Sequence, residues 1–158
     1  MRMRQRWYGL TGLAVRTALV ATLALGFAAP VQSYGAIDQP TTHHNYDRGV
    51  EAIETAHWSL AVQNLTLVVK DEPNHADAHA WLGYAYGKLG LSEPALRHLR
   101  HALKLSPRHV GANAHLGTMY AIAGDKARAR QYLAVVERLC GRDCPEFAEL
   151  AHAIDGAR

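Results

Sequence analysis

The sequence predicts an all-α solenoid, that is, a stack of about three helix-turn-helix repeats followed by a C-terminal capping helix. The main observation is an internal period of about 34 residues. It is clearest where residues 76–109 align with residues 110–140. Within each repeat, apolar residues recur at helical intervals, and glycine or proline separates the helical stretches. One helix pair cannot bury its apolar face alone, so several pairs must stack.

The alignment rests on identical residues at equivalent positions. The matching pairs are Leu82 with Leu116, Gly83 with Gly117, Tyr86 with Tyr120, Gly90 with Gly124, Ala95 with Ala129, Leu99 with Leu133 and Leu105 with Leu139. A fainter copy precedes them, in which Gly49, Ala61, Leu65 and Pro73 keep the register.

Each repeat is expected to contain two helices. In the second repeat, the first helix ends at Gly90, and the second begins near Ser92 and ends before Pro107. The third repeat is expected to form helices from about 110 to 123 and from 126 to 139. Gly83 and Ala95 lie on opposite helices of one pair, where small side chains allow a close approach. A last amphipathic helix is predicted over 145–154, with Phe147, Leu150, Ala151 and Ile154 on one face.

The repeats resemble the tetratricopeptide repeat family over about residues 42–140. The positions that carry the resemblance are Leu82, Gly83, Tyr86, Gly90, Ala95, Leu99, Ala102 and Pro107. The resemblance implies a right-handed solenoid whose first helices line a concave groove for an extended peptide or a partner's helix. The end of the chain, from Leu139 to Glu146, also resembles small exported bacterial members of this family.

Several positions depart from the family pattern. The first copy has Arg48, Ala52 and Ala56 in place of the leucine, tyrosine and helix-stopping glycine. If the turn at Ala56 requires a positive φ, alanine costs about 1 kcal/mol there. The tryptophan at the fourth position of the repeat is replaced by His79 and Asn113.

The N-terminal segment is expected to be an export signal. Four arginines precede or interrupt an apolar run from Thr17 to Ala29, and small residues allow cleavage after Ser33. We therefore predict a periplasmic or secreted protein, with an uncleaved membrane anchor as the alternative. The predicted organisation is a signal peptide at 1–33, a flexible linker at 34–42, a degenerate repeat at 43–75, repeats at 76–109 and 110–141, and a capping helix at 142–158.

The charge distribution argues against a nucleic-acid partner. Four of the 17 lysines and arginines lie before Tyr34, whereas all 14 acidic residues lie after Ser33. The exported part would therefore have a formal net charge of −1. Its basic residues include Arg97, Arg100, Lys104 and Arg108 on one side of a predicted second helix. This stripe is either a solvated face or a surface for an acidic partner or an anionic lipid.

The two cysteines and ten histidines are the residues that could carry chemistry. Cys140 and Cys144 are expected to form a disulfide in an oxidising compartment, where the bond would fix the entry of the capping helix. Redox chemistry or metal capture is the alternative for this pair. Among the histidines, His75 with His79, His98 with His101, and the adjacent His43 and His44 have spacings that suit zinc, copper or nickel. No further ligand is evident, and solvated polar positions are the favoured interpretation.

The predicted partner-binding groove follows from the first helices. Asp77, Trp81, Tyr84 and Lys88 share one helical face, and aromatic residues on such a face favour recognition. With the matching positions of the other repeats, the predicted set is Tyr46, Asp47, Val50, Glu54, Asp77, Trp81, Tyr84, Lys88, His115, Thr118 and Ile122. The alternative is that Trp81 or Tyr84 only packs between repeats. The family's clamp for chaperone C-terminal carboxylates is not expected, because Tyr46 and Val50 occupy its Lys and Asn positions.

The sequence therefore favours a non-catalytic interaction scaffold or adaptor that binds a protein or peptide of unknown identity in the cell envelope. It shows no nucleophile–base signature, phosphate-binding glycine loop or metalloprotease helix, so we predict no catalytic residue, no cofactor and no resident metal. Membrane attachment is expected only through an uncleaved N-terminal segment, and self-association is left open. The alternative function is a periplasmic metal-binding protein or metallochaperone that uses the histidines or the Cys140–Cys144 pair.

Overall fold

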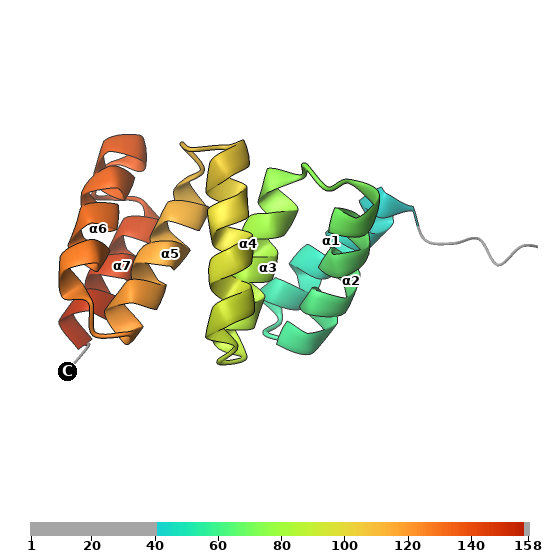
Figure 1. Cartoon of the computed structure of the whole chain (residues 1–158), viewed down its shortest axis with the longest axis horizontal. Coiled ribbons are helices and arrows are strands. Elements are labelled where there is room, and N and C mark those ends of the chain that lie inside the picture. Colours follow the sequence, from blue (N-terminus) through green and yellow to red (C-terminus); the bar gives the residue numbers. More distant parts are fainter. Residues whose placement is uncertain (1–40, 157–158) are drawn as a thin grey trace, which may run out of the picture. The chain divides into compact units, whose positions relative to one another are not determined.

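The computed structural model describes residues 41–156, which contain seven α-helices and no strand (Figure 1). The helices are α1 (Thr42–Glu54), α2 (Trp58–Asp71), α3 (Ala76–Lys88), α4 (Ser92–Leu105), α5 (Val110–Ile122), α6 (Lys126–Cys140) and α7 (Pro145–Gly156). The predicted all-α helical repeat fold is confirmed. The predicted signal peptide, and the linker up to residue 40, lie outside the described residues.

The helices pair in the order of the sequence. α1 packs on α2, α3 on α4 and α5 on α6, and each pair also contacts the next. The first helices α1, α3, α5 and α7 contact one another in succession, and α7 also packs on α6 (Figure 1). The first helices therefore form one continuous face, which we call the first-helix face.

The period of the sequence also governs the helix starts. Thr41, His75 and His109 occupy the same position of successive repeats and are the N-caps of α1, α3 and α5. The side chain of each accepts a hydrogen bond of 3.2 Å from the backbone N–H three residues later. Each cap satisfies one of the amide groups that the first helical turn leaves without a partner. Two of the ten histidines thus have a structural role that the spacing of metal ligands did not suggest.

The turn inside each repeat requires a left-handed residue. Gly90 and Gly124 have φ of 75° and 80°, and Ala56 at the equivalent position has φ of 58°. It is the only non-glycine residue with positive φ in the part of the chain that the structure describes. The first repeat therefore keeps the turn geometry of the others, with the conformational cost that an alanine brings.

Close contact between helices depends on glycine in the first helix of each pair. A Cβ added to Gly83 would lie 2.5 Å from Leu99 Cγ and 3.1 Å from the Ala95 carbonyl oxygen. At Gly49 the nearest atom would be Leu65 Cγ, at 2.6 Å. Real Cβ atoms do not approach other atoms so closely, so the helices of these pairs are held at a spacing that excludes any side chain at these positions.

Buried polar side chains fix the loops between repeats. His79 Nε2 lies 2.9 Å from the carbonyl oxygen of Pro73, and Asn113 Nδ2 donates to the carbonyl oxygen of Pro107 at 3.2 Å. Both side chains are buried, at the position where the family pattern has tryptophan. A hydrogen bond to the loop thus replaces part of the apolar packing that a tryptophan would give.

The first and last helices of the array differ from the repeat pattern, because each has a neighbouring repeat on one side only. Arg48 is exposed, whereas Leu82 and Leu116 at equivalent positions are buried against the preceding repeat. At the other end, Leu150 and Ile154 are buried against α5 and α6. Leu150 is the equivalent of Leu116 one period later, so α7 continues the register as the first helix of a further half-repeat.

Among the described helices, none has both the length and the apolar character required to span a membrane.

We predict that Ala56→Gly raises the free energy of unfolding by about 1 kcal/mol, because glycine adopts a positive φ without the steric cost of a Cβ. Urea unfolding followed by circular dichroism measures the change. Gly90→Ala at the equivalent turn is the matched control and should lower the stability by a similar amount. Equal stability of Ala56→Gly and the parent chain would show that Ala56 is not strained.

Candidate functional site

A small hollow lies on the first-helix face, between α3 and α5. Its volume is about 60 Å³. Five of the predicted groove residues line it, namely Tyr84, Lys88, His115, Thr118 and Ile122, together with Gly83, Gly87, Leu99 and Met119. We call it the α3–α5 hollow. Gly87 contributes to its depth, since a Cβ there would lie 3.2 Å from the sulfur of Met119.

The rings of Tyr84 and His115 line the hollow, and further aromatic rings lie beside these two. The ring of Tyr84 stacks on His115 with centroids 4.3 Å apart, and Trp81 lies close to both, at 6.1 Å and 6.2 Å. Trp58 of α2 meets Tyr84 edge-on at 5.7 Å. Trp81 and Tyr84 also pack against the buried core of the first two repeats, yet both stay partly exposed. Each ring therefore packs on the core and keeps part of its surface open to solvent, so packing between repeats is observed and a role in recognition stays a prediction.

Charges at the edge of the hollow come from two helices. Lys88 Nζ lies 4.9 Å from the centroid of the Tyr84 ring and 4.0 Å from Glu149 Oε1 of α7. Glu149 was not among the predicted residues. It is the equivalent of His115 one period later, so the register extended through α7 would have identified it. The pair is about half exposed and is therefore worth little to stability.

His115 is neutral in this setting. One edge of the side chain stays accessible, but the ring lies among aromatic side chains, and no ion pair of the described residues includes it. Burial, followed by the charges of His109 and Lys88, lowers the pKa of His115 to about 3. The hollow therefore presents an uncharged imidazole beside the Lys88 ammonium throughout the physiological pH range.

The predicted groove residues on α1 lie outside the group of rings formed by Trp81, Tyr84 and His115. Tyr46 stacks on His75 with centroids 4.8 Å apart, and burial and the Asp77 carboxylate raise its pKa. Asp77 itself lies 3.0 Å from His109 Nε2 and so connects α3 with the cap of α5. The remaining predicted residues on α1 are the exposed Asp47 and Glu54 and the half-buried Val50.

The histidines do not associate as their spacing suggested. His79 Nδ1 lies 2.9 Å from His98 Nδ1, across the α3–α4 pair, and the His79 and His101 rings are 4.3 Å apart. Because His79 Nε2 must donate to the Pro73 carbonyl, its Nδ1 is the acceptor and His98 Nδ1 is the donor. Both nitrogens that face each other are thus used in one hydrogen bond. Burial lowers the pKa of His79, and burial with the charges of His79 and Arg97 lowers that of His98 to about 4.

Cys140 and Cys144 form a disulfide with an S–S distance of 2.07 Å, at the joint between α6 and α7. With Glu146 they make up the only group of three metal-ligand side chains whose donor atoms lie close together within residues 41–156. Because the two sulfurs are bonded to each other, neither is present as a thiolate, which is the form that binds metal.

Comparison with known proteins supports the repeat assignment. Residues 76–109 match the family described as Tetratricopeptide repeat. A comparison with curated proteins finds no match.

Three solved structures show the same fold. The TPR2B domain of yeast Sti1, in a pHsp70 complex, is 20% identical with a TM-score of 0.64, and the match covers 74% of this chain and 98% of that one. A thermophilic TPR protein of Thermus thermophilus is 23% identical with a TM-score of 0.63, covering 72% and 63% of the two chains. An O-GlcNAc transferase mutant of Thermobaculum terrenum is 21% identical with a TM-score of 0.67, but this chain spans only 23% of its length.

We predict that the protein loses stability as the pH falls from about 6.5 to about 4. The folded-state pKa of His98 is about 4 and that of His115 about 3, both below the ordinary value of 6.5. The unfolded chain therefore binds more protons than the folded chain in this window, and stability that is complete above pH 6.5 declines toward pH 4. The contribution of the half-buried His98 is on the order of 2 kcal/mol.

Urea unfolding at a series of pH values tests this. The variant His98→Gln keeps a donor toward His79 but cannot titrate, so its stability should depend less steeply on pH. His152→Gln, on the exposed side of α7, is the control for the loss of an imidazole. A pH dependence of His98→Gln identical to that of the parent chain would contradict the prediction.

Proposed function

We propose that this chain is a non-catalytic interaction scaffold that holds a segment of a protein partner against the first-helix face. The observation that carries the proposal is the convergence of Trp81, Tyr84 and His115 around the α3–α5 hollow, with Lys88 at its edge. Partly exposed aromatic rings held by packing on their other side lose little conformational entropy on binding, which is why such residues dominate interface energetics.

The chemistry of the face indicates what a bound segment must provide. The hollow has room for a short aliphatic side chain, and Ile122, which is 72% exposed, would cover more apolar surface beside it. Lys88 and Glu149 offer one charge of each sign at the edge, so polar groups of the segment can be paired on either side. The acidic Asp47, Glu54 and Asp77 extend the face toward α1.

The structural likeness to the Sti1 domain supports this use of the fold, because that domain was solved in a complex with pHsp70. The partner of this chain is expected to be different. The carboxylate clamp of the family needs Lys and Asn at positions where this chain has Tyr46 and Val50. The likeness to the transferase concerns less than a quarter of that protein's length and lends no support to a catalytic role here.

We further propose that the scaffold acts in the cell envelope. The proposal rests on the arginine-rich start, the apolar run from Thr17 to Ala29 and the disulfide, since disulfides persist in oxidising compartments. The partner would then be another periplasmic or secreted protein.

We predict that Trp81→Ala combined with Tyr84→Ala weakens partner binding at least about thirtyfold, as expected for two central aromatic anchors. The partner is first identified by affinity purification from the native organism with the parent chain as bait. Its purified form is then titrated calorimetrically into the parent and the variant. Gln63→Ala with Thr66→Ala, on the exposed side of α2, is the matched control and should bind as the parent does. Unchanged affinity of the aromatic variant, with its helicity intact, would exclude the first-helix face.

We predict that the protein isolated from its native organism begins at Tyr34. Mass spectrometry of the intact chain measures the mature N-terminus, and fractionation shows the compartment. A chain that starts at Met1 and is recovered with membranes would support the uncleaved anchor instead. A chain that starts at Met1 and is recovered from the cytoplasm would contradict export.

A further inference from the structure

A second surface with different chemistry lies on the outer side of the second helix pair. Arg97, Arg100, Lys104 and Arg108 are all exposed, and they follow one side of α4 and the loop after it. We call these four residues the α4 basic stripe. At the helical rise, the three members on α4, Arg97 to Lys104, extend over about 10 Å, and Arg108 follows in the loop.

The other repeats show that the fold does not require this stripe. The equivalent residues are Gln63, Thr66, Lys70 and Asn74 in the first repeat, and Gln131, Ala134, Arg138 and Arg142 in the third. The three pairs share the same helices, the same turns and the same core positions. Four positive charges at adjacent exposed positions occur in one copy alone, so packing of the repeat does not explain them.

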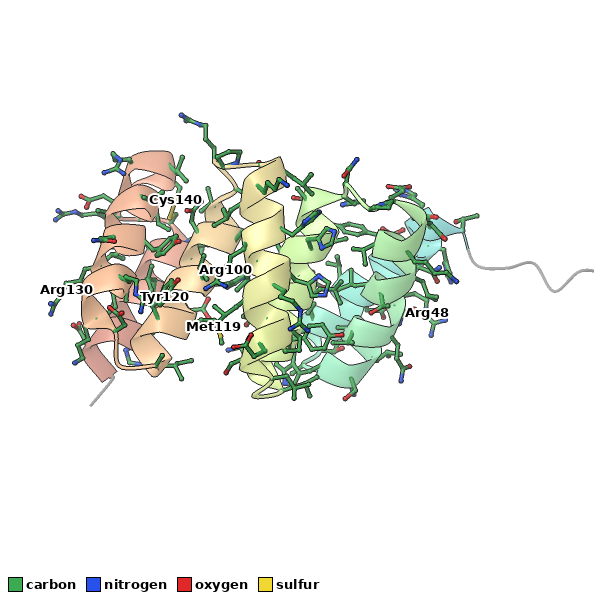
Figure 2. The ribbon with its side chains drawn as sticks, viewed as in Figure 1. Arg48, Arg100, Met119, Tyr120, Arg130 and Cys140 are labelled. Atoms are coloured by element: carbon green, nitrogen blue, oxygen red, sulfur yellow. A yellow bond between two sulfur atoms is a disulfide. The ribbon has the colours of Figure 1, made fainter. Side chains whose placement is uncertain are left out.

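The stripe continues toward α6 through a tyrosine. The Arg100 guanidinium lies near Tyr120, and the Arg128 guanidinium lies 4.4 Å from the centre of the Tyr120 ring. Figure 2 shows Arg100 and Tyr120 close together on this part of the molecule. Arg100 first, and then Arg128, lower the pKa of Tyr120. Two guanidinium groups from different repeats therefore approach one hydroxyl at the junction of α4, α5 and α6.

Few acidic groups offset this charge. Arg128 pairs with Asp125, the N-cap of α6. No ion pair within residues 41–156 involves a member of the α4 basic stripe. The stripe is therefore an exposed positively charged surface that is complementary to an acidic partner.

We propose that the α4 basic stripe binds an acidic segment of a second protein, independently of the first-helix face. Carboxylates four and three residues apart on a helix, or at alternate positions of an extended segment, would match the spacing of the stripe. A polypeptide is favoured over a lipid bilayer because surfaces that bind bilayers combine basic residues with inserted apolar ones. The exposed large apolar residues of the described chain are Leu60, Leu67, Leu89, Leu91 and Ile122; of these only Leu91, the N-cap of α4, adjoins α4 or α6, and it lies at the end of α4 away from Lys104 and Arg108.

With two such surfaces, the chain would join two partners rather than hold one. The first-helix face offers aromatic rings and acidic residues, whereas the α4 basic stripe offers guanidinium and ammonium groups. Their ligands must differ in chemistry, so neither would displace the other.

The test is fluorescence anisotropy of a labelled oligoglutamate peptide with the full chain, at low and at near-physiological salt. The variant Arg97→Gln, Arg100→Gln, Lys104→Gln should weaken binding at least about tenfold and reduce its salt dependence. The matched control is Arg48→Gln, Lys70→Gln, Arg130→Gln, which removes the same charge. Arg48 and Arg130 lie at opposite ends of the described helices, away from Arg100 (Figure 2). This control should change the affinity less than about twofold.

Two further variants separate the surfaces and guard against a folding defect. Arg97→Gln with Lys104→Gln leaves Arg100 beside Tyr120 and should still weaken binding several-fold. Trp81→Ala with Tyr84→Ala should bind the peptide as the parent does, so that failure of the first-helix face and failure of the stripe are distinguished.

Three results would overturn the proposal. One is the absence of peptide binding by the parent chain. Another is equal loss of binding in the stripe variant and its charge-matched control. The third is tighter binding of vesicles made from equal parts phosphatidylcholine and phosphatidylglycerol, or of a single-stranded oligonucleotide, than of the peptide, which would assign the stripe to a lipid surface or a nucleic acid.

Discussion

The close approach of two helices at a glycine is the contact from which the remaining architecture follows. At Gly83 and Gly49, the leucine of the partner helix occupies the space that a Cβ would need. This contact sets the distance between the helices of a pair, and the left-handed turn at Gly90 sets their direction. Because the helix pairs share the same internal geometry, each pair stacks on the next in the same way. The first helices of successive pairs therefore lie next to one another. The rings of Tyr84 and His115 meet at 4.3 Å as a result, although they belong to different repeats.

The histidines show that polar residues at equivalent positions of the repeats also have structural roles. His75 and His109 recur at the same position of successive repeats because both cap first helices. His79 occupies the buried position of a missing tryptophan and bonds the loop carbonyl of Pro73. A histidine content that suggests metal binding in the sequence is thus partly explained by caps and loop contacts. The hydrogen bond between His79 and His98 requires a neutral His79 ring, which agrees with the lowered pKa of both residues.

The fold was predictable because the period repeats the same residue at many packing and turn positions, most clearly in the second and third copies. The site was predictable only helix by helix. Spacing along α3 placed Trp81 and Tyr84 on one face correctly relative to each other, but it carried no information on contacts between elements. The His79–His98 bond crosses a helix pair, and Glu149 reaches Lys88 from α7. Neither could be obtained from local periodicity, although extending the register through α7 gives the position of Glu149.

In a repeat protein, a residue that is present in one repeat but not at the equivalent positions of the others is not required by the shared fold. Such a residue is a candidate for a functional role. Many inward-facing positions are constrained alike in successive repeats, as Leu82 and Leu116 show, which are the same residue and are both buried. Exposed positions lack this constraint, and Arg97 and Arg100 of α4 have uncharged counterparts in both other repeats. Arg48 shows the one structural exception, since an end of the array must present a polar surface. The α4 basic stripe is interior to the array and cannot be explained as an end. Its charges are therefore better explained by a partner than by the stability of the stack.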